Sequence, residues 1–418
     1  MLEHILGLKC LICGQEYKLD EIDYVCPKHG NEGIVDLVYD YARIGRVFSR
    51  NRLAGSQNQT MWRYLPLLPV RTDTPLPSLP VGWTPLLPAR ALGSQIGLPN
   101  LWLKDDGRNP TASFKDRASA LAVVKGRERR ADVITTASTG NAAAALAGLC
   151  ASVGQKNVIF VPRAAPPAKV TQLLVYGATV LLVDGTYDDA FELCLQAAVE
   201  FGWYNRNTAY NPMMSEGKKT AAYEICEQFD FDPPDRVFVS VGDGCIIGGL
   251  YKGFKDMAAL GWIDKIPRLM GVQAAGSNYL YQAWKKGEDV LAKPAIRAST
   301  VADSISAGLP RDRLKALAAV TETGGAFIEV ADEAILAAIP ALARASGVFA
   351  EPAAAAAYAG LLAAISQNQV SPDEHILLLI TGSGLKDVPA ASQAAAQSGV
   401  KAHTIDPTLK ALKKALNL

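Results

Sequence analysis

Short apolar runs alternate with longer stretches of helical spacing over most of the chain. Strand-like runs cover residues 132–137, 157–162, 179–184, 236–242, 268–274 and 376–382. Residues 187–201 repeat apolar side chains at helical spacing, and further helices are expected to begin near Asn141, Glu216, Asp332 and Pro352. Continuous apolar strands alternating with helices predict an α/β protein whose parallel sheets are covered on both faces.

A proline-rich run interrupts this pattern before the first of these strands. The run spans about residues 65–98, and its residues 65–93 read LPLLPVRTDTPLPSLPVGWTPLLPARALG. Proline disfavours helix interiors and central strands, so the run predicts an extended connector wrapped over a larger body. The main domain is expected to open near Leu101.

Composition and charge exclude several classes of function. The 418 residues carry 42 Lys and Arg against 41 Asp and Glu, and 49% are hydrophobic. A net charge near zero provides no global field for nucleic acid or an anionic membrane, and the basic run at residues 125–130 is predicted to be an exposed helix end. No apolar stretch approaches the ~20 residues of a membrane span, and MLEHILGLKC lacks signal-peptide features. We expect a cytoplasmic protein with no membrane or nucleic-acid partner.

Three of the seven cysteines crowd the N-terminus. Cys10 and Cys13 form one C-x-x-C pair, and Cys26 and His29 form a C-x-x-H pair beside glycine. Two such pairs match a tetrahedral Zn²⁺ site on a small zinc ribbon. The alternative is that these are buried thiols of a small lobe.

The turns after the strands carry the candidate chemistry, because ligands of parallel sheets sit at the carboxyl ends of strands. Ser138, Thr139, Gly140 and Asn141 follow the first strand and open an alanine-rich helix. Hydroxyls and free helix amides together suit a carboxylate, although simple N-capping explains them equally well.

A glycine-rich turn follows the run at residues 236–242. Gly242, Asp243, Gly244, Cys245 and Ile246 lead into another helix and form a candidate phosphate cradle. Position 247 is isoleucine where a dinucleotide fingerprint needs glycine, and there is no Walker lysine. A cofactor with a single phosphate therefore fits better than a nicotinamide. Thr381 similarly lies between the last apolar strand and glycines.

Lys115 lies in NPTASFKDRAS, among small and hydroxylated residues. A lysine that forms an imine needs such a setting, because its amine must be aimed and kept partly neutral. Pyridoxal 5'-phosphate, with one phosphate, one ring and one aldehyde, would use this lysine and all three turns.

These residues resemble the threonine synthase family of pyridoxal-phosphate enzymes with the tryptophan-synthase-β fold (fold type II), including its cysteate synthase branch. The resemblance spans about residues 82–387 and rests on the motifs KDDGRNPTASFKDR, TTASTGN, YNPMMSEGKKTAAYEI, VGDGCIIGGLYKGF, VFAEPAAAAAYAG and ITGSGLKD. It implies two three-layer αβα domains with parallel-rich sheets and a small N-terminal zinc-ribbon-like extension. It also implies a homodimer that acts on a small amino-acid substrate, expected to be phosphorylated.

The resemblance also implies a division of the chain and roles for particular residues. Its segments would be a ribbon (1–40), a connector (41–100), the large domain (101–134 and 216–400), the small domain (135–215) and a tail (401–418). Lys115 would be the catalytic Schiff-base lysine with Phe114 beside it, Asn141 would bond the cofactor's phenolic oxygen, and Thr381 would meet the pyridine nitrogen. The cofactor phosphate would be held by Gly242, Asp243, Gly244, Cys245 and Ile246. The substrate carboxylate would be bound by Ser138, Thr139, Gly140 and Asn141. A neutral hydroxyl at the pyridine nitrogen suits elimination and replacement rather than transamination.

Some positions depart from the family pattern and leave the substrate open. Asp243 puts a carboxylate in the phosphate turn, and Ser383, Asp303 and Ser304 are also unusual. Cations for a substrate phosphate could come from Lys104, Arg108, Arg163, Lys169 or Lys218. The resemblance favours threonine synthase; the alternatives are cysteate synthase, a threonine or serine dehydratase, and a non-catalytic sensor.

Overall fold

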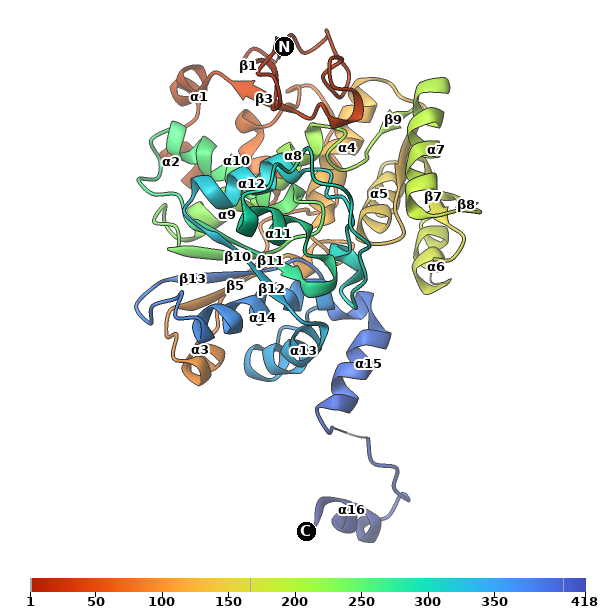
Figure 1. The fold of residues 1–418 in the computed structure, drawn as a ribbon, viewed down its shortest axis with the longest axis vertical. Helices are drawn as coiled ribbons and strands as arrows, with labels where there is room; N and C mark the ends of the chain where they lie inside the picture. The colour runs from red at the N-terminus through yellow and green to blue at the C-terminus, as the bar shows by residue number, and fades with distance from the viewer. Residues whose placement is uncertain (1, 166, 401) are drawn as a thin grey trace.

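The computed structural model describes residues 2–165, 167–400 and 402–418 and contains three sheets (Figure 1). The largest has the strand order β12-β11-β10-β13-β5-β4. Its strands are parallel except at β4, which pairs antiparallel with β5. The bounds are β4 (Leu86–Pro88), β5 (Leu101–Asp105), β10 (Arg236–Ser240), β11 (Arg268–Ala274), β12 (Ala326–Val330) and β13 (Ile376–Ile380).

Helices cover both faces of this sheet, as the apolar runs predicted. Along β10, Val237 and Val239 join the core on one face and Phe238 joins the core on the other. This period-two alternation lets a wholly apolar strand fill two cores. One face carries α3 (Arg90–Ile96), α13 (Asp332–Ser346), α14 (Pro352–Ser366) and α15 (Val388–Gln397); the other carries α4 (Lys115–Glu128), α8 (Met213–Lys218), α9 (Thr220–Gln228), α10 (Cys245–Ala259), α11 (Tyr279–Lys286) and α12 (Arg313–Glu322).

A second, four-stranded parallel sheet has the order β8-β7-β6-β9. Its strands are β6 (Val133–Ala137), β7 (Lys156–Pro162), β8 (Thr179–Val183) and β9 (Tyr204–Asn205); α7 (Tyr187–Glu200) covers one face, and α5 (Asn141–Ser152) and α6 (Pro167–Val175) cover the other. The expected burial of β8 on both faces is wrong. This strand lies at the sheet edge, and Leu182 is 55% exposed.

The prediction of an extended connector is also wrong in one part. Residues 90–96 form α3, because the stretch after Pro88 contains no proline until Pro99. The helix ends at Gly97, whose φ of +73° favours glycine. Two short helices, α1 (Tyr41–Val47) and α2 (Arg50–Ala54), precede the proline-rich run.

The N-terminal extension is an antiparallel sheet of β1 (Ile5–Cys10), β2 (Glu16–Tyr17) and β3 (Val35–Tyr39). Its apolar residues, including Leu8 and Leu37, belong to the same cluster as Leu250 of α10. The Lys252 ammonium donates to the Leu37 carbonyl oxygen at 2.7 Å. The extension therefore packs against the helices of the large sheet and shares their hydrophobic core.

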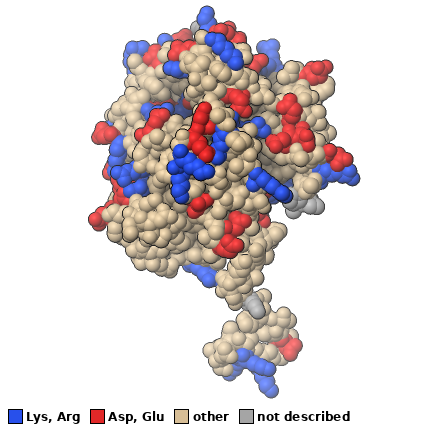
Figure 2. Space-filling model, in the orientation of Figure 1, with Lys and Arg blue, Asp and Glu red and all other residues tan. Residues whose placement is uncertain are grey.

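The starts of the small sheet and of α8 bear on where the small unit begins and ends. The small sheet begins at Val133, and α8 of the large unit begins at Met213, so we propose boundaries just before each of these residues. The tail ends in α16 (Leu409–Leu416), which lies apart from the rest of the molecule (Figure 1). None of the helices within the described residues is long and apolar enough to cross a membrane. Basic and acidic side chains intermingle over the face seen in Figure 2.

Candidate active site and metal centre

A cavity of about 550 Å³ opens where the two parallel sheets present their strand ends. Its walls include the carboxyl ends of β6 and β10 and the first residues of α4, α5 and α10. This volume is within the usual range for small-molecule sites. Lys115, Ser138, Thr139, Gly140, Asn141 and the turn from Gly242 to Ile246 all line it. The structure therefore brings together the predicted lysine, carboxylate turn and phosphate turn.

Lys115 is the first residue of α4 and points its amine into this cavity. Desolvation by burial and the nearby Lys218 ammonium lower the pKa of Lys115 to about 8. A substantial neutral fraction near neutral pH is what a nucleophilic amine needs.

Phe114 and Thr381 lie beside each other next to the lysine. The Phe114 amide donates to the Thr381 carbonyl oxygen at 2.8 Å, and both side chains are buried. Neither is among the residues that line the cavity. Their predicted contacts with a cofactor ring stay predictions.

Asn141 begins α5 and faces a carboxylate that the sequence did not single out. Its side-chain amide donates to Glu351 at 2.8 and 3.1 Å and to the Ser304 hydroxyl at 3.3 Å. Burial raises the pKa of Glu351 above its usual value, although the Asn141 hydrogen bond and Lys115 oppose the shift. The sequence signal is a lone acid in the apolar stretch VFAEPAAAAA.

The Gly242–Ile246 turn joins β10 to the N-terminus of α10. Gly244 has a φ of +91°, and a Cβ there would lie 2.7 Å from the Ala316 Cβ atom. Only glycine fits this position without strain. Asp243 accepts the Arg311 amide at 3.3 Å, while burial raises the pKa of its carboxyl.

Several buried polar atoms around the cavity have no partner among the described residues. They are the Ser240 hydroxyl, the Lys218 ammonium and one terminal nitrogen of Arg206. Buried polar groups are normally satisfied, so donors without a protein partner at a cavity wall suit an anionic ligand. Together with the helix amides and the Lys115 amine, they fit a phosphorylated aldehyde such as pyridoxal phosphate.

The other candidate phosphate-binding cations are already paired. Lys104 is buried at 2.7 Å from Glu224, and Lys169 forms an ion pair with Asp303 at the rim of a smaller neighbouring cavity. Arg108 and Arg163 also have acidic partners, Asp105 at 3.2 Å and Asp184 at 3.6 Å, respectively.

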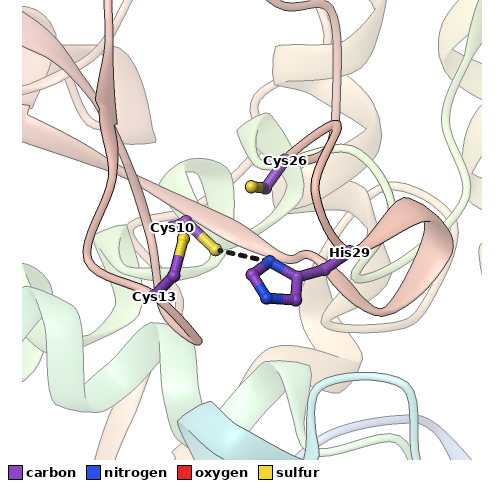
Figure 3. A group of neighbouring side chains, drawn as sticks. All are labelled: Cys10, Cys13, Cys26 and His29. Carbon is purple, nitrogen blue, oxygen red and sulfur yellow. Dashed lines mark hydrogen bonds between the residues drawn. The ribbon is translucent and has the colours of Figure 1, made fainter.

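The four predicted metal ligands also converge (Figure 3). The ligand atoms of Cys10, Cys13, Cys26 and His29 all lie within 4.8 Å of one another, and the Cys10 sulfur is 3.8 Å from the His29 Nδ1. A tetrahedral zinc with bonds of about 2.0–2.3 Å needs its ligands roughly 3.3–3.8 Å apart, so a small contraction would complete the shell.

The surroundings of Cys26 favour a thiolate. Burial opposes ionisation, but hydrogen bonds from Tyr17 and His29 outweigh it and lower the pKa of Cys26 to about 6. The Tyr17 hydroxyl lies 3.0 Å from this sulfur. Since the thiolate is the zinc-binding form, the donor set fits zinc.

Comparison with known proteins identifies one family. A family model described as pyridoxal-phosphate dependent enzyme matches residues 77–382. The threonine synthase of Methanocaldococcus jannaschii is 37% identical over 98% of this chain and 99% of its own. That of Methanosarcina acetivorans is 39% identical over 91% and 92%, respectively.

Solved structures with the same fold include more distant enzymes. Threonine deaminase isoform 2 of Solanum lycopersicum superposes with a TM-score of 0.65, at 22% identity, over 83% of this chain and 95% of that chain. The diaminopropionate ammonia lyase of Escherichia coli gives a TM-score of 0.64 at 18% identity, over 86% and 92%. At such identities the likeness describes the fold alone.

Proposed function

The chain belongs to the pyridoxal-phosphate-dependent enzyme family, and we propose that it is a threonine synthase, which converts O-phosphohomoserine and water to threonine and phosphate. The observation that carries the proposal is one cavity lined by the Lys115 amine, the start of α5 and a glycine turn at the start of α10. The similarity to threonine synthases over nearly the whole chain supports this substrate.

Lys115 would bind the cofactor and afterwards move protons. Bound pyridoxal phosphate supplies an electron sink that stabilises negative charge beside the substrate's α-carbon. Lys115 would release the cofactor to the substrate amine and then take the α-proton on its Nζ atom. A pKa of about 8 supports both roles, because the amine can accept and return a proton near neutral pH.

The remaining residues would hold the reactants. The first amides of α5 and the hydroxyls of Ser138 and Thr139 would take the substrate carboxylate, while Asn141 would orient the cofactor ring. Amides of the Gly242–Ile246 turn would take the cofactor phosphate, and Thr381 would meet the pyridine nitrogen. Glu351, which accepts from Asn141, would fix that amide's orientation.

The Cys10, Cys13, Cys26 and His29 cluster would hold a structural zinc ion, since its four ligands leave no open position for substrate. We also propose that the chain works in the cytoplasm as a homodimer. Seven free cysteines suit a reducing compartment. Light scattering on the purified protein would test the dimer.

The deciding experiment measures phosphate release by the cofactor-loaded protein, with amino-acid products identified. O-phosphohomoserine, O-phosphoserine with sulfite, and unphosphorylated serine or threonine are compared, with Lys115→Ala as the inactive control. We expect phosphate and threonine from O-phosphohomoserine alone. Cysteate from O-phosphoserine would instead identify a cysteate synthase, and ammonia release from serine or threonine would identify a dehydratase.

A further inference from the structure

Two adjacent lysines at the end of α8 have opposite surroundings. The Lys219 ammonium lies 2.6 Å from Glu216 and 2.8 Å from Asp256, all three fully buried. Lys218 is equally buried, but within the described parts of the chain its ammonium forms neither a hydrogen bond nor an ion pair, whereas Lys219 has two ion pairs. Burying an unpaired charge is costly, so folding alone gives no reason to keep Lys218.

Lys218 lies in the wall of the cavity that the phosphate turn also lines. Lys218 lines the large cavity, and its Cβ atom lies against Gly249, one turn into α10. Cys245 and Ile246, at the start of α10, line the same cavity as Lys218. A charged Lys218 would therefore share one cavity with the free amides of the α10 N-terminus.

Arg206 provides a second, incompletely paired cation in the same wall. Its guanidinium donates to Ser119 at 3.1 Å and to Thr208 at 3.2 Å, both neutral hydroxyls. One terminal nitrogen is buried without a partner, and Arg206 forms no ion pair with a described residue. Arg206 and Lys218 therefore line the same cavity as the phosphate turn.

Two carboxylates lie at or next to the phosphate turn. Asp243 lies in the turn itself; Asp312, which lies 3.9 Å from the Lys315 ammonium, accepts a hydrogen bond from the Cys245 thiol. Two carboxylates would repel a phosphate unless opposite charge offsets them. Besides Lys115, Lys218 and Arg206 are the cations of the cavity wall that form no ion pair with a residue in the described part of the chain.

We propose that Lys218 and Arg206 form a two-cation subsite for a phosphate dianion beside the Gly242–Ile246 turn, and that they offset the carboxylates of Asp243 and Asp312. The dianion is the cofactor's phosphate or the phosphate of the substrate. The inference rests on the proposed cofactor site, but its test needs no turnover and is independent of threonine synthase activity.

The test compares wild type with Lys218→Met and Arg206→Met in two binding measurements. Full-length protein freed of cofactor is titrated with pyridoxal phosphate and with pyridoxal, which lacks the phosphate. The cofactor-loaded protein is titrated with inorganic phosphate, followed by the cofactor's absorbance. We expect each variant to lose at least tenfold in the preference for pyridoxal phosphate over pyridoxal, or in phosphate affinity. Loss in the first titration assigns the subsite to the cofactor; loss in the second assigns it to the substrate.

Two controls separate binding from folding. Lys156→Met removes an exposed lysine at the start of β7 and is expected to change neither titration. Lys218→Met should melt at the same or a higher temperature than wild type without ligands, whereas Lys219→Met should melt lower. The proposal is overturned if both affinities stay within twofold of wild type, or if Lys218→Met melts lower than wild type.

Discussion

Asn141 and Glu351 lie 210 residues apart in the sequence and form a buried hydrogen bond of 2.8 Å at the cavity wall. The bond joins the first residue of α5, in the small unit, to the residue before α14, in the large one. The orientation of the Asn141 amide therefore depends on how the two units sit together.

Replacing Glu351 by glutamine should change how stability depends on pH. Burial raises the pKa of Glu351. As pH rises, the unfolded chain therefore loses this proton at a lower pH than the folded protein does. Wild type should lose stability relative to Glu351→Gln as pH rises from about 4.5 through that raised pKa, by about 1.4 kcal/mol for each pKa unit of difference.

Denaturant unfolding of the cofactor-free protein between pH 4 and pH 8 measures this effect. The control, Glu200→Gln at an exposed helix end, should track wild type at every pH. A constant difference between Glu351→Gln and wild type across the range would show that Glu351 is not the titrating group.

Replacing Lys115 by methionine should remove the cofactor's visible absorbance and stabilise the cofactor-free protein at neutral pH. The pKa of Lys115 is about 8, against 10.5 for an ordinary lysine. The penalty for charging this amine is fully present below pH 8 and declines toward pH 10.5, because a neutral lysine is buried more cheaply. The variant's advantage should be on the order of 2–3 kcal/mol at pH 7.

Unfolding of wild type and variant at pH 7, 8.5 and 10 tests this sign. The difference in the free energy of unfolding between variant and wild type should become smaller as pH rises. A gap that widens with pH would mean that the folded state stabilises the charged amine, contrary to its position in the cavity.

Removing the metal should loosen the N-terminal extension. The ribbon is connected to the active-site side of the molecule through Arg313, which binds Glu32, and through Ile34, which packs on Cys245. Cys26→Ser should lose bound zinc and lower the melting temperature by about 2–4 °C, as a loss of ~2–3 kcal/mol would do in a chain of this size.

Elemental analysis and thermal unfolding check this prediction, with His403→Ala in the exposed tail as a control that keeps its metal. One zinc per wild-type chain is expected. Wild type that contains no zinc after purification in zinc-supplemented medium would contradict the assignment.

A buried ion-pair network should fix α4, and with it Lys115. Arg117, two residues after the lysine, binds Asp106 at 2.6 Å and Glu224 at 2.5 Å with all three side chains fully buried. Glu224→Ala leaves Arg117 without one partner and should cost about 3–5 kcal/mol.

The exposed ion pair of Lys156 and Asp132 serves as the control for the stability loss at Glu224. Lys156 and Asp132 lie 3.1 Å apart but are about three-quarters exposed, so Lys156→Ala should cost less than about 1 kcal/mol. Urea unfolding of both variants makes the comparison. Equal losses would mean that the buried network does not hold α4.

Local signals in the sequence determined much of this protein. Period-two and helical spacing are properties of short stretches, so β6, β7, β8, β10, β11 and β13 and the helices α5, α13 and α14 could be located from them. The strands β4, β5, β9 and β12 were not among the predicted runs. The glycines around Asp243, the setting of Lys115 and the two ligand pairs at Cys10 and Cys26 are local as well. Each of these patterns reflects the backbone conformation or the chemistry of its own short segment.

Only the tertiary structure decided which groups have partners. Lys218 and Lys219 are neighbours of the same type, yet Asp256 from α10 pairs with one and leaves the other facing the cavity. Glu351 reaches Asn141 across the two units, and β8 is exposed because no strand lies beyond it. Charge pairing and burial depend on residues distant in the chain, and a periodic pattern carries no information about them.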